Sequence, residues 1–423
     1  MIRYLNQFKM LERIRYHAVP PAFILFFTFI VQYLAIKGKG ENFTVDLMQK
    51  CMLGNTTSWI WSVIIVLWGA VSLKVPAKDV KGPETSFGVR PIYKGNGFQY
   101  YCFTLIIYIL MDQLFPVSAS LYENFPQLLG SFNIIAMLLC IFLLIKGKVS
   151  PTHKNDKVKR DPLLYEFYRG MELHPTVFGL DIKQLTNCRI GLMGWQIFIH
   201  AFFVTSVGKY GFNHAVFVNY ILQTVYLAKF FWWEAGYFYT LDMMFDRAGY
   251  YICWGCLVWV PCLYTYSSYY IVQHQPSLQT NQALLFLIAG LLSITLNYLV
   301  DYEKQKFRNA KDYKCKIWGK EASFIRAEYV DGKGRKKTSA LLTSGFWGIS
   351  RHMNYTFELL AAFSWCGVGG FENAPMVHLY FIFLFGLLIH RTFRDEDKCE
   401  AKYKRHWKLY CEKVPYRLLP YIW

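Results

Sequence analysis

The stretch at residues 301–355 opens as DYEKQKFRNAKDYKCKIWGK (301–320) and closes as LLTSGFWGISRHMNY (341–355). Between Asp301 and Gly345 it carries 12 Lys and Arg residues against 6 Asp and Glu. Strongly apolar segments lie on both sides of it. The tail HRTFRDEDKCEAKYKRHWKLY (390–410) repeats the same mixture of cations, acids and aromatic rings. We expect these two stretches to form one cytosolic pocket for an anionic cofactor, because Lys and Arg are the natural ligands of phosphate groups.

Ten apolar runs make up most of the remaining chain. A helix needs about 20 residues to cross the hydrocarbon of a bilayer, and several runs reach only the lower end of that range. The runs are residues 20–36, 57–73, 98–115, 128–145, 190–207, 215–231, 250–272, 283–300, 357–371 and 376–389. They predict an all-α integral membrane protein with about ten transmembrane helices, with eight to ten as the range that the lengths allow. The two short last runs also suit one re-entrant pair.

Composition and charge support a membrane protein. Of the 423 residues, 54% are apolar and 19% aromatic, too many for an ordinary soluble domain. The net charge is +18, but the cations sit in loops between apolar runs. With the N-terminus inside, three of the four inside loops and the tail are basic; the exception is the acidic loop 232–249. Outside loops 116–127 and 273–282 hold no Lys or Arg, although the first outside loop holds three Lys. This distribution indicates the positive-inside rule and not nucleic-acid binding.

The start of the chain has the character of a membrane anchor. Residues 1–18 hold Arg3, Lys9, Arg13 and Arg15, and no short apolar region with a small-residue cleavage site follows. We expect a first span with a basic leader, not a removed signal peptide. The 11 Cys residues are scattered, so the sequence predicts neither a disulfide framework nor a zinc site.

The usual soluble signatures of nucleotide and metal sites are missing from the sequence. It contains no GxGxxG after a strand, no GxxxxGK[ST] and no HExxH. We therefore expect no metal. A nucleotide site, if present, must use the basic stretch and the tail.

Three types of side chain in those stretches suit a nucleotide. Lys304 and Arg308 suit phosphates, although cations just past a span more often only anchor it in the membrane. Trp347 offers a wall for a planar ring, and Asp395 and Asn354 suit a ribose. Together they predict a nucleotide pocket that lacks a Rossmann loop.

A second candidate site is the loop WWEAGYFYTLDMMFDRAGYY (232–251). Ionisable groups at membrane depth are expensive to bury, and they are often functional. Glu234, Tyr237 and Asp242 are flanked by Trp and Phe, although solvated acids in a loop would give the same pattern. A buried phenol or carboxylic acid here is suited to donate a proton, because burial favours the neutral form.

Several long motifs resemble the sterol reductase family. They are VKGPETSFGVRPIYKGNG (80–97), EAGYFYTLDMMFDRAGYYICWGCLVWVPCLYT (234–265), CKIWGK (315–320), LLTSGFWGISRHMNY (341–355), RDEDKCEAKYKRHWKLY (394–410) and VPYRLLPYIW (414–423). The resemblance runs from about residue 74 to 423. It is strongest to plant-type members of the Δ7 branch, which reduces the C7–C8 double bond of Δ5,7-sterols.

The resemblance implies ten membrane helices in one domain, residues 1–423, and NADPH as cofactor. Residues 1–231 would be N-terminal helices, and residues 232–423 would hold the sterol and NADPH. Carried over by position, the NADPH contacts would be Lys304, Arg308, Leu342, Trp347, Asn354, Tyr355, Asp395, Cys399, Glu400, Ala401, Lys402, Tyr403 and Tyr410. The chain departs from the family pattern at Phe357 and Glu358, where Gly-Asp is common, and at Glu400, where a small residue is usual.

The implied reaction needs an acid as well as a hydride. An isolated alkene must be protonated before it accepts hydride, so we expect Tyr237 to be the acid, oriented by Asp242 or Glu234. Either carboxylic acid is an alternative donor if burial keeps it protonated. Aromatic rings nearby would stabilise the carbocation.

Other functions share parts of this pattern. The alternatives are a reductase of the Δ14 or C24 sterol bond, a membrane methyltransferase of the isoprenylcysteine type, a structural or sterol-sensing relative, and a transporter. The expected partners are a sterol substrate from the bilayer and membrane lipid, without nucleic acid, and the oligomeric state stays open. The expected location is the endoplasmic reticulum membrane in a eukaryote or the cytoplasmic membrane in a bacterium.

Overall fold

The chain packs into two compact units. The computed structural model describes residues 12–156, 161–330 and 334–423, so Arg3 and Lys9 of the basic leader lie outside the described residues. The first unit comprises Met1–Asn213 and Leu227–Gln275. The second comprises His214–Tyr226 and Pro276–Trp423. Helix α10 (His214–Trp232) therefore begins in the second unit and ends in the first.

The first unit is almost entirely helical. Its membrane-length helices are α2 (Val19–Gly38), α4 (Thr56–Lys74), α5 (Gly97–Leu114), α7 (Phe125–Val149) and the continuous pair η2 (Gln184–Leu192) and α9 (Met193–Tyr210). Shorter helices are η1 (Ile14–Ala18), α3 (Val45–Leu53), α6 (Val117–Glu123), α8 (Leu163–Arg169), α11 (Glu234–Tyr237), α12 (Leu241–Met244), η3 (Tyr250–Tyr264) and α13 (Tyr266–Gln273). Two small antiparallel hairpins complete it: β1 (Asp79–Lys81) with β2 (Ile92–Lys94), and β3 (Thr176–Val177) with β4 (Leu180–Asp181).

Local sequence explains several helix boundaries in this unit. Asn55 and Ser58 form a reciprocal capping box at the start of α4, and Thr44 caps α3. Pro261 lies inside η3, where it removes a backbone donor, and the segment has the wide π-helical form. Outer faces remain apolar: Leu25 and Phe26 of α2 are exposed, as lipid contact requires.

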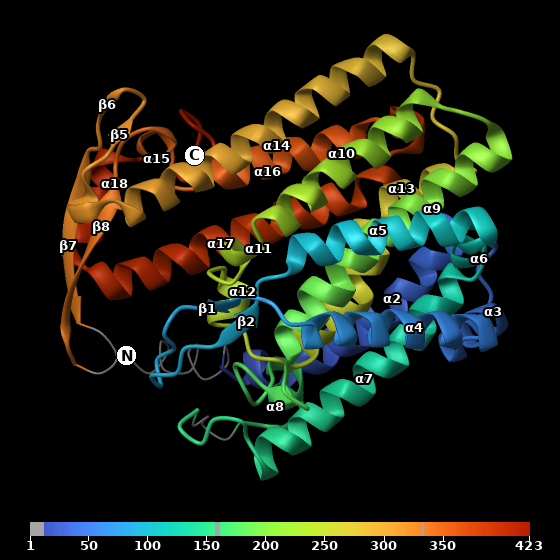
Figure 1. The fold of residues 1–423 in the computed structure, drawn as a ribbon, viewed down its shortest axis with the longest axis horizontal. Coiled ribbons are helices and arrows are strands. Elements are labelled where there is room, and N and C mark those ends of the chain that lie inside the picture. The colour runs from blue at the N-terminus through green and yellow to red at the C-terminus, as the bar shows by residue number, and fades with distance from the viewer. Residues whose placement is uncertain (1–11, 157–160, 331–333) are drawn as a thin grey trace. The chain divides into compact units, whose positions relative to one another are not determined.

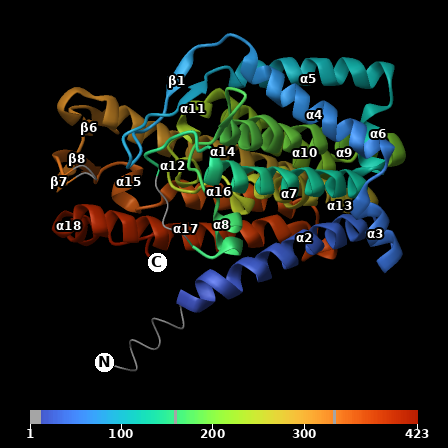
Figure 2. The ribbon, with the colours of Figure 1, turned by 90° about the horizontal axis from the view of Figure 1, so that it is seen from below.

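The second unit joins long helices to a hairpin platform. Helix α14 (Thr280–Asn309) packs along α16 (Met353–Gly367), which packs on α17 (Leu379–Tyr403), and the three run together in Figure 1. In Figure 2, the strands β7 (Phe324–Val330) and β8 (Lys336–Leu342) lie with α18 (Arg405–Lys413) at one end of α17. The smaller elements are η4 (Lys311–Tyr313), β5 (Lys316–Ile317), β6 (Lys320–Glu321), α15 (Phe346–Ile349), η5 (Phe371–Asn373) and η6 (Met376–His378).

The described parts of the basic stretch, residues 301–330 and 334–355, therefore form defined elements. Its first residues, 301–309, extend helix α14. Strands β7 and β8 then pair antiparallel over their full lengths, from Phe324↔Leu342 to Val330↔Lys336. One buried cluster, Val300, Phe307, Leu342, Trp347 and Phe357 among others, joins α14, β8, α15 and α16. This cluster fixes the basic stretch against the end of a membrane helix.

The all-α membrane architecture is confirmed, but the count of ten spans is not. In the described part of the chain, seven helices are long and apolar enough to cross a membrane, and eight if the bent pair α5 and α6 is one span. The predicted run 250–272 is divided between η3 and α13, and the run 357–371 becomes the 15-residue helix α16. Both are shorter than a bilayer requires.

Candidate functional site

One face of α14 carries the polar groups of the second unit. Asn297, Asp301, Lys304 and Arg308 follow one another at spacings of four, three and four residues, which places them on the same side of a helix. The Lys304 ammonium lies 3.5 Å from the centroid of the Trp347 ring. Trp347 is itself fixed, because its indole N–H donates to the Val300 carbonyl at 2.9 Å. The predicted pair of Lys304 and Trp347 is thus in direct contact.

Helix α16 supplies the opposite side. The Asn354 side-chain amide donates to Asp301 Oδ1 at 3.2 Å, and the Asn354 carbonyl accepts from Asn297 Nδ2 at 2.9 Å. Tyr355 stacks on His352 with ring centroids 5.0 Å apart. Within the described residues, Asn354 Oδ1 and His352 Nε2 are buried and have no hydrogen-bond partner. Unsatisfied buried polar atoms are uncommon, and two beside a pair of cations point to a ligand site.

Helix α17 contributes the third side. Asp395 and Cys399 both lie within electrostatic range of Lys304, and Arg308 lies in range of Cys399. Tyr410 of α18 closes the arrangement, since its hydroxyl donates to the Trp347 carbonyl at 3.4 Å. Burial raises the pKa of the Tyr410 phenol, which keeps it neutral. Neither Lys304 nor Arg308 forms an ion pair or hydrogen bond with its side chain in the described residues, so both cations can bind an anion.

The other predicted cofactor residues fall into two groups. Leu342 and Tyr403 are buried in the packing around the platform. Glu400, Ala401 and Lys402 are exposed on α17, and the Lys402 ammonium lies over the Tyr329 ring at 4.2 Å. The structure brings together Lys304, Arg308, Trp347, Asn354, Tyr355, Asp395, Cys399 and Tyr410. In the part of the chain that the structure describes, Glu400 and Ala401 form no hydrogen bond or ion pair with that group, and they share only its helix α17.

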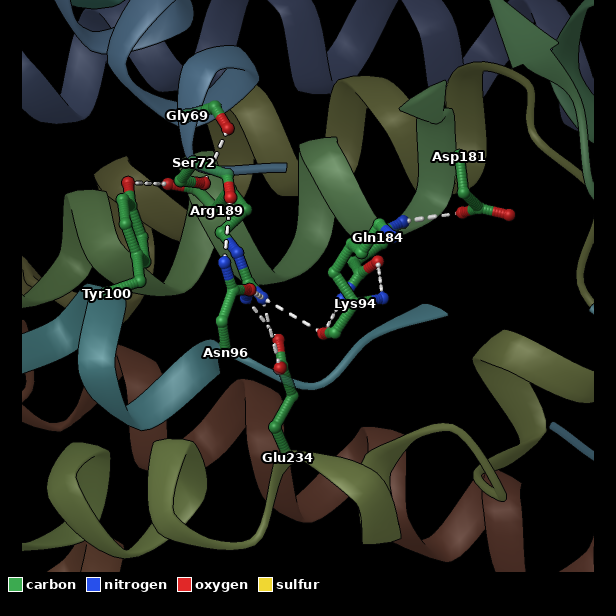
Figure 3. A network of polar contacts seen from close by, with 9 residues as sticks. All are labelled: Gly69, Ser72, Lys94, Asn96, Tyr100, Asp181, Gln184, Arg189 and Glu234. Atoms are coloured by element: carbon green, nitrogen blue, oxygen red, sulfur yellow. Dashed lines mark hydrogen bonds and ion pairs between the residues drawn. The ribbon is translucent and has the colours of Figure 1, made fainter. Parts of the chain in front are cut away.

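A buried ion pair anchors the loop of the first unit. Arg189 of η2 is fully buried, and it forms an ion pair with both carboxylate oxygens of Glu234, with Nη2 and Oε2 3.1 Å apart (Figure 3). Arg189 also donates to Asn96 Oδ1 at 2.9 Å. The Arg189 guanidinium thus contacts both carboxylate oxygens of Glu234, and the role of Glu234 as an orienting group or proton donor stays a prediction.

Two more side chains from the same segment hold this loop. Asn187 Nδ2 donates to the Tyr237 hydroxyl at 2.9 Å. The Lys183 ammonium donates to the carbonyls of Met243 and Asp246 at 2.8 and 2.7 Å. Burial lowers the pKa of Lys183 to about 8, against the raising effect of Asp181, Asp246 and Asp242. Asp242 thus lies within electrostatic range of Lys183, and Tyr237 accepts a hydrogen bond from an amide. The orientation of Tyr237 by Asp242 or Glu234 stays a prediction.

Sequence reasoning missed a second phenol–carboxylate pair. In the second unit, the Tyr226 hydroxyl donates to Glu358, whose other oxygen accepts from Asn297 Nδ2 at 3.1 Å. Asn297 also holds Asn354, so this pair adjoins the cation-lined group. One sequence signal was present: Glu358 is an acid inside an apolar run. Its partner Tyr226 is 132 residues away, and no local pattern connects them.

Comparison with known proteins identifies the family. The sequence model described as "Ergosterol biosynthesis ERG4/ERG24 family" matches residues 8–423. The chain belongs to the ERG4/ERG24 sterol reductase family. It is 42% identical to the 7-dehydrocholesterol reductase of Arabidopsis thaliana over 85% of this chain and 84% of that protein. The Xenopus laevis enzyme of the same name is 34% identical over 80% of this chain and 72% of its own length.

A relative with a different name is also similar. The Delta(14)-sterol reductase of Methylotuvimicrobium alcaliphilum is 30% identical over 86% of this chain and 84% of that protein.

As a sterol reductase and multi-pass membrane protein, the chain is an oxidoreductase of sterol biosynthesis, and it needs a reductant. Within the described residues, two cations that form no ion pair, a tryptophan ring and two unsatisfied buried polar atoms fit a reduced nicotinamide cofactor.

Proposed function

We propose that this protein reduces the C7–C8 double bond of a Δ5,7-sterol such as 7-dehydrocholesterol, with NADPH as cofactor. The choice of bond is supported by the relatives: identity is 42% to the Arabidopsis enzyme named for that reaction and 30% to the bacterial Δ14 enzyme. The proposal of a nicotinamide dinucleotide is supported by the contact of Lys304 with Trp347 beside Arg308. Cations that form no ion pair among the described residues suit phosphates, and the ring suits a planar base.

In this proposal, different residues of the second unit bind different parts of NADPH. Lys304 and Arg308 bind phosphates, and one of them selects the 2′-phosphate that distinguishes NADPH from NADH. Asp395 and Asn354 hold ribose hydroxyls, and Trp347 forms the wall behind a ring. The other members of the proposed contact set are Leu342, Tyr355, Cys399, Glu400, Ala401, Lys402, Tyr403 and Tyr410.

The chain's own part in the chemistry is to deliver a proton. A bound nicotinamide cofactor would supply the hydride for one alkene carbon, and a residue of this chain would supply the proton for the other. Tyr237 is the first proposed donor. Because Asn187 donates to its oxygen, its own O–H is directed elsewhere, and the same hydrogen bond stabilises the phenolate that remains. Asp242 near the same loop orients it in this proposal.

Tyr226 is a second candidate donor, and a specific observation favours it. It belongs to the unit that carries the cofactor residues, and Glu358 accepts its hydrogen bond. Once the phenol has lost its proton, the adjacent Glu358 carboxylate can relay a proton from water back to it. Asn297 fixes Glu358 and Asn354 together, which links the proton site to the cofactor site.

Substrate conversion tests the proposed function. Membranes from a host without sterols, expressing the full chain, are given NADPH and one of three sterols: 7-dehydrocholesterol, a Δ8,14-diene or a Δ24 sterol. Mass spectrometry should find product from the first. Product from only the second or third would assign the protein to another sterol bond. Methyl transfer from S-adenosylmethionine, with no sterol product, would favour the methyltransferase.

Two phenylalanine variants separate the candidate acids. Tyr237→Phe and Tyr226→Phe each remove one hydroxyl. The variant that loses turnover by a factor of about 10² to 10⁴, while NADPH still binds, identifies the donor. Full turnover in both variants would exclude both phenols.

The proposed setting is a membrane that supplies the substrate. A sterol dissolved in the bilayer reaches the protein from the lipid phase, so sterol and lipid are the proposed partners. In a eukaryotic cell the proposed location is the endoplasmic reticulum membrane; in a bacterium it is the cytoplasmic membrane.

A further inference from the structure

His352 lies between α15 and α16 and is rigidly held. Its backbone N–H donates to the Arg417 carbonyl at 3.0 Å, which ties it to the C-terminal segment. Its side chain is 5% exposed. The imidazole stacks almost parallel on Tyr355, with 10° between the rings. The position of the ring is thus determined by packing and not by a hydrogen bond of its own nitrogens.

The ring nitrogen Nε2 has no hydrogen-bond partner among the described residues. An imidazole nitrogen that is buried without a partner loses its hydration and gains no hydrogen bond in return, which is unfavourable. Asn354 Oδ1, two residues away in the chain, is in the same situation. Two such atoms only two residues apart are most simply explained by a ligand that supplies the missing partners.

The charge state of His352 limits what that ligand group can be. Burial, Lys304 and Arg351 together lower the pKa of His352 to about 3, so the ring is neutral at physiological pH. A neutral imidazole offers one donor and one acceptor and no charge. It therefore suits an amide or a hydroxyl and adds little to the binding of a phosphate.

The order of charged and neutral groups along α14 also indicates a neutral ligand group near His352. A helix rises 1.5 Å per residue, so Arg308 lies about 10 Å further along the axis than Asp301. The cations Arg308 and Lys304 are at the end away from the apolar part of the helix. Asp301, which holds Asn354, is nearer to it, and Asn297 with Glu358 is nearer still. The site thus changes from cationic to neutral toward the membrane-spanning part.

We propose that His352 binds the nicotinamide half of the cofactor, through its carboxamide or the adjoining ribose hydroxyls. This assignment rests on the NADPH site proposed above. It adds a residue that neither the predicted contact set nor the phosphate ligands include. It also orients the cofactor: the phosphates face Lys304 and Arg308, and the nicotinamide faces the Tyr226–Glu358 pair.

Calorimetric titration of the purified full chain with two probes tests the proposal. NADPH contains both halves of the cofactor, whereas adenosine 2′,5′-bisphosphate has the adenosine phosphates and no nicotinamide. His352→Phe keeps the stacked ring and removes both nitrogens. We expect its Kd for NADPH to rise about tenfold, the usual effect of one lost hydrogen bond, with the bisphosphate Kd unchanged. His352→Gln, which keeps a donor and an acceptor, should recover part of the loss.

Two matched variants complete the design. Lys304→Met should weaken both probes. His274→Phe removes an imidazole stacked on Tyr270 at 4.0 Å in the first unit, and it should change neither. Wild-type NADPH affinity in His352→Phe, or equal weakening of both probes, would overturn the assignment of His352 alone. Failure of the wild-type chain to bind NADPH would overturn the proposed function and this inference with it.

Discussion

At the scale of single residues, the Arg189–Glu234 ion pair is a fully buried charge pair with a clear energetic consequence. Removing one member of such a pair leaves an uncompensated charge and typically costs about 3–5 kcal/mol. We expect Arg189→Met to destabilise the first unit by about that amount, measured as the unfolding midpoint in detergent. Because removing both charges avoids the stranded carboxylate, Arg189→Met with Glu234→Leu should recover part of the loss.

The exposed pair of Lys50 and Asp46 is a suitable control for this prediction. Its side chains are 70% and 73% exposed, so Lys50→Met should change stability by less than about 0.5 kcal/mol. Equal effects of Arg189→Met and Lys50→Met would show that the buried pair does not hold the loop.

Lys304 and Arg308 support a second prediction at this scale. Both cations would contact the cofactor in the ground state and the transition state alike, so their loss should raise KM for NADPH more than it lowers kcat. Steady-state kinetics of Lys304→Ala and Arg308→Ala measure this. Arg308→Ala should also lose preference for NADPH over NADH, if Arg308 binds the 2′-phosphate. A fall in kcat with unchanged KM would instead place these residues at the reacting atoms.

At the scale of elements, Gly345 controls the start of α15. Its φ is +61°, and an added Cβ would meet the Glu303 carboxylate, which accepts a hydrogen bond from the Phe346 N–H at 3.0 Å. Gly345→Ala should therefore combine backbone strain of about 1–3 kcal/mol with loss of that cap. Since Trp347 follows directly, we expect weaker NADPH binding as well as a lower unfolding temperature.

Gly319→Ala is a control that separates backbone strain from displacement of the Glu303 carboxylate. Gly319 also has a positive φ, +79°, but nothing lies within 4 Å of its added Cβ. It should show the strain cost without the effect on NADPH binding. Weakened NADPH binding in Gly319→Ala, equal to that in Gly345→Ala, would contradict the proposed role of the Glu303 cap.

Elements also show where sequence reasoning stops. Apolar runs predicted the long helices because each run is continuous in the chain. The hairpin of β7 and β8 was not predicted. Its buried Ala327 packs against Trp407 and Tyr410 of α18, and this contact forms only in the folded chain. The π-helical form of η2 and η3 was likewise not visible in the composition of those runs.

At the scale of the whole molecule, the sequence predicted candidate-site residues whose side-chain chemistry suggests a role. It missed residues whose role depends on a partner that is distant in the sequence. Lys304, Arg308 and Trp347 were selected for their chemistry and location, and the structure brings them together. Glu358 accepts a hydrogen bond from Tyr226, 132 residues away in the sequence, and Glu234 pairs with Arg189, 45 residues away. Both pairs form only when the chain folds. His352 stood inside a quoted motif, but its unsatisfied nitrogen is a property of the packed structure.

Among the described residues, His174 of the first unit and His352 of the second are buried histidines that make stability depend on pH. Burial is the main cause that lowers the pKa of His174 in the first unit and of His352 in the second, each to about 3. The unfolded chain takes up protons below about pH 6.5, whereas the folded chain keeps both rings neutral down to about pH 3. Stability from these groups is therefore complete above pH 6.5 and is lost as the pH falls toward 3.

The expected size is about 2 kcal/mol per histidine at pH 5, since one pKa unit corresponds to about 1.4 kcal/mol. Unfolding midpoints of the full chain between pH 7 and pH 5 measure the loss. His174→Gln and His352→Gln should each reduce the pH dependence of the unfolding midpoint by about the contribution of one histidine. The double variant should reduce it further. The two shares should add, because the residues belong to different units and are not coupled. An unchanged slope in both variants would mean that other groups carry the acid sensitivity.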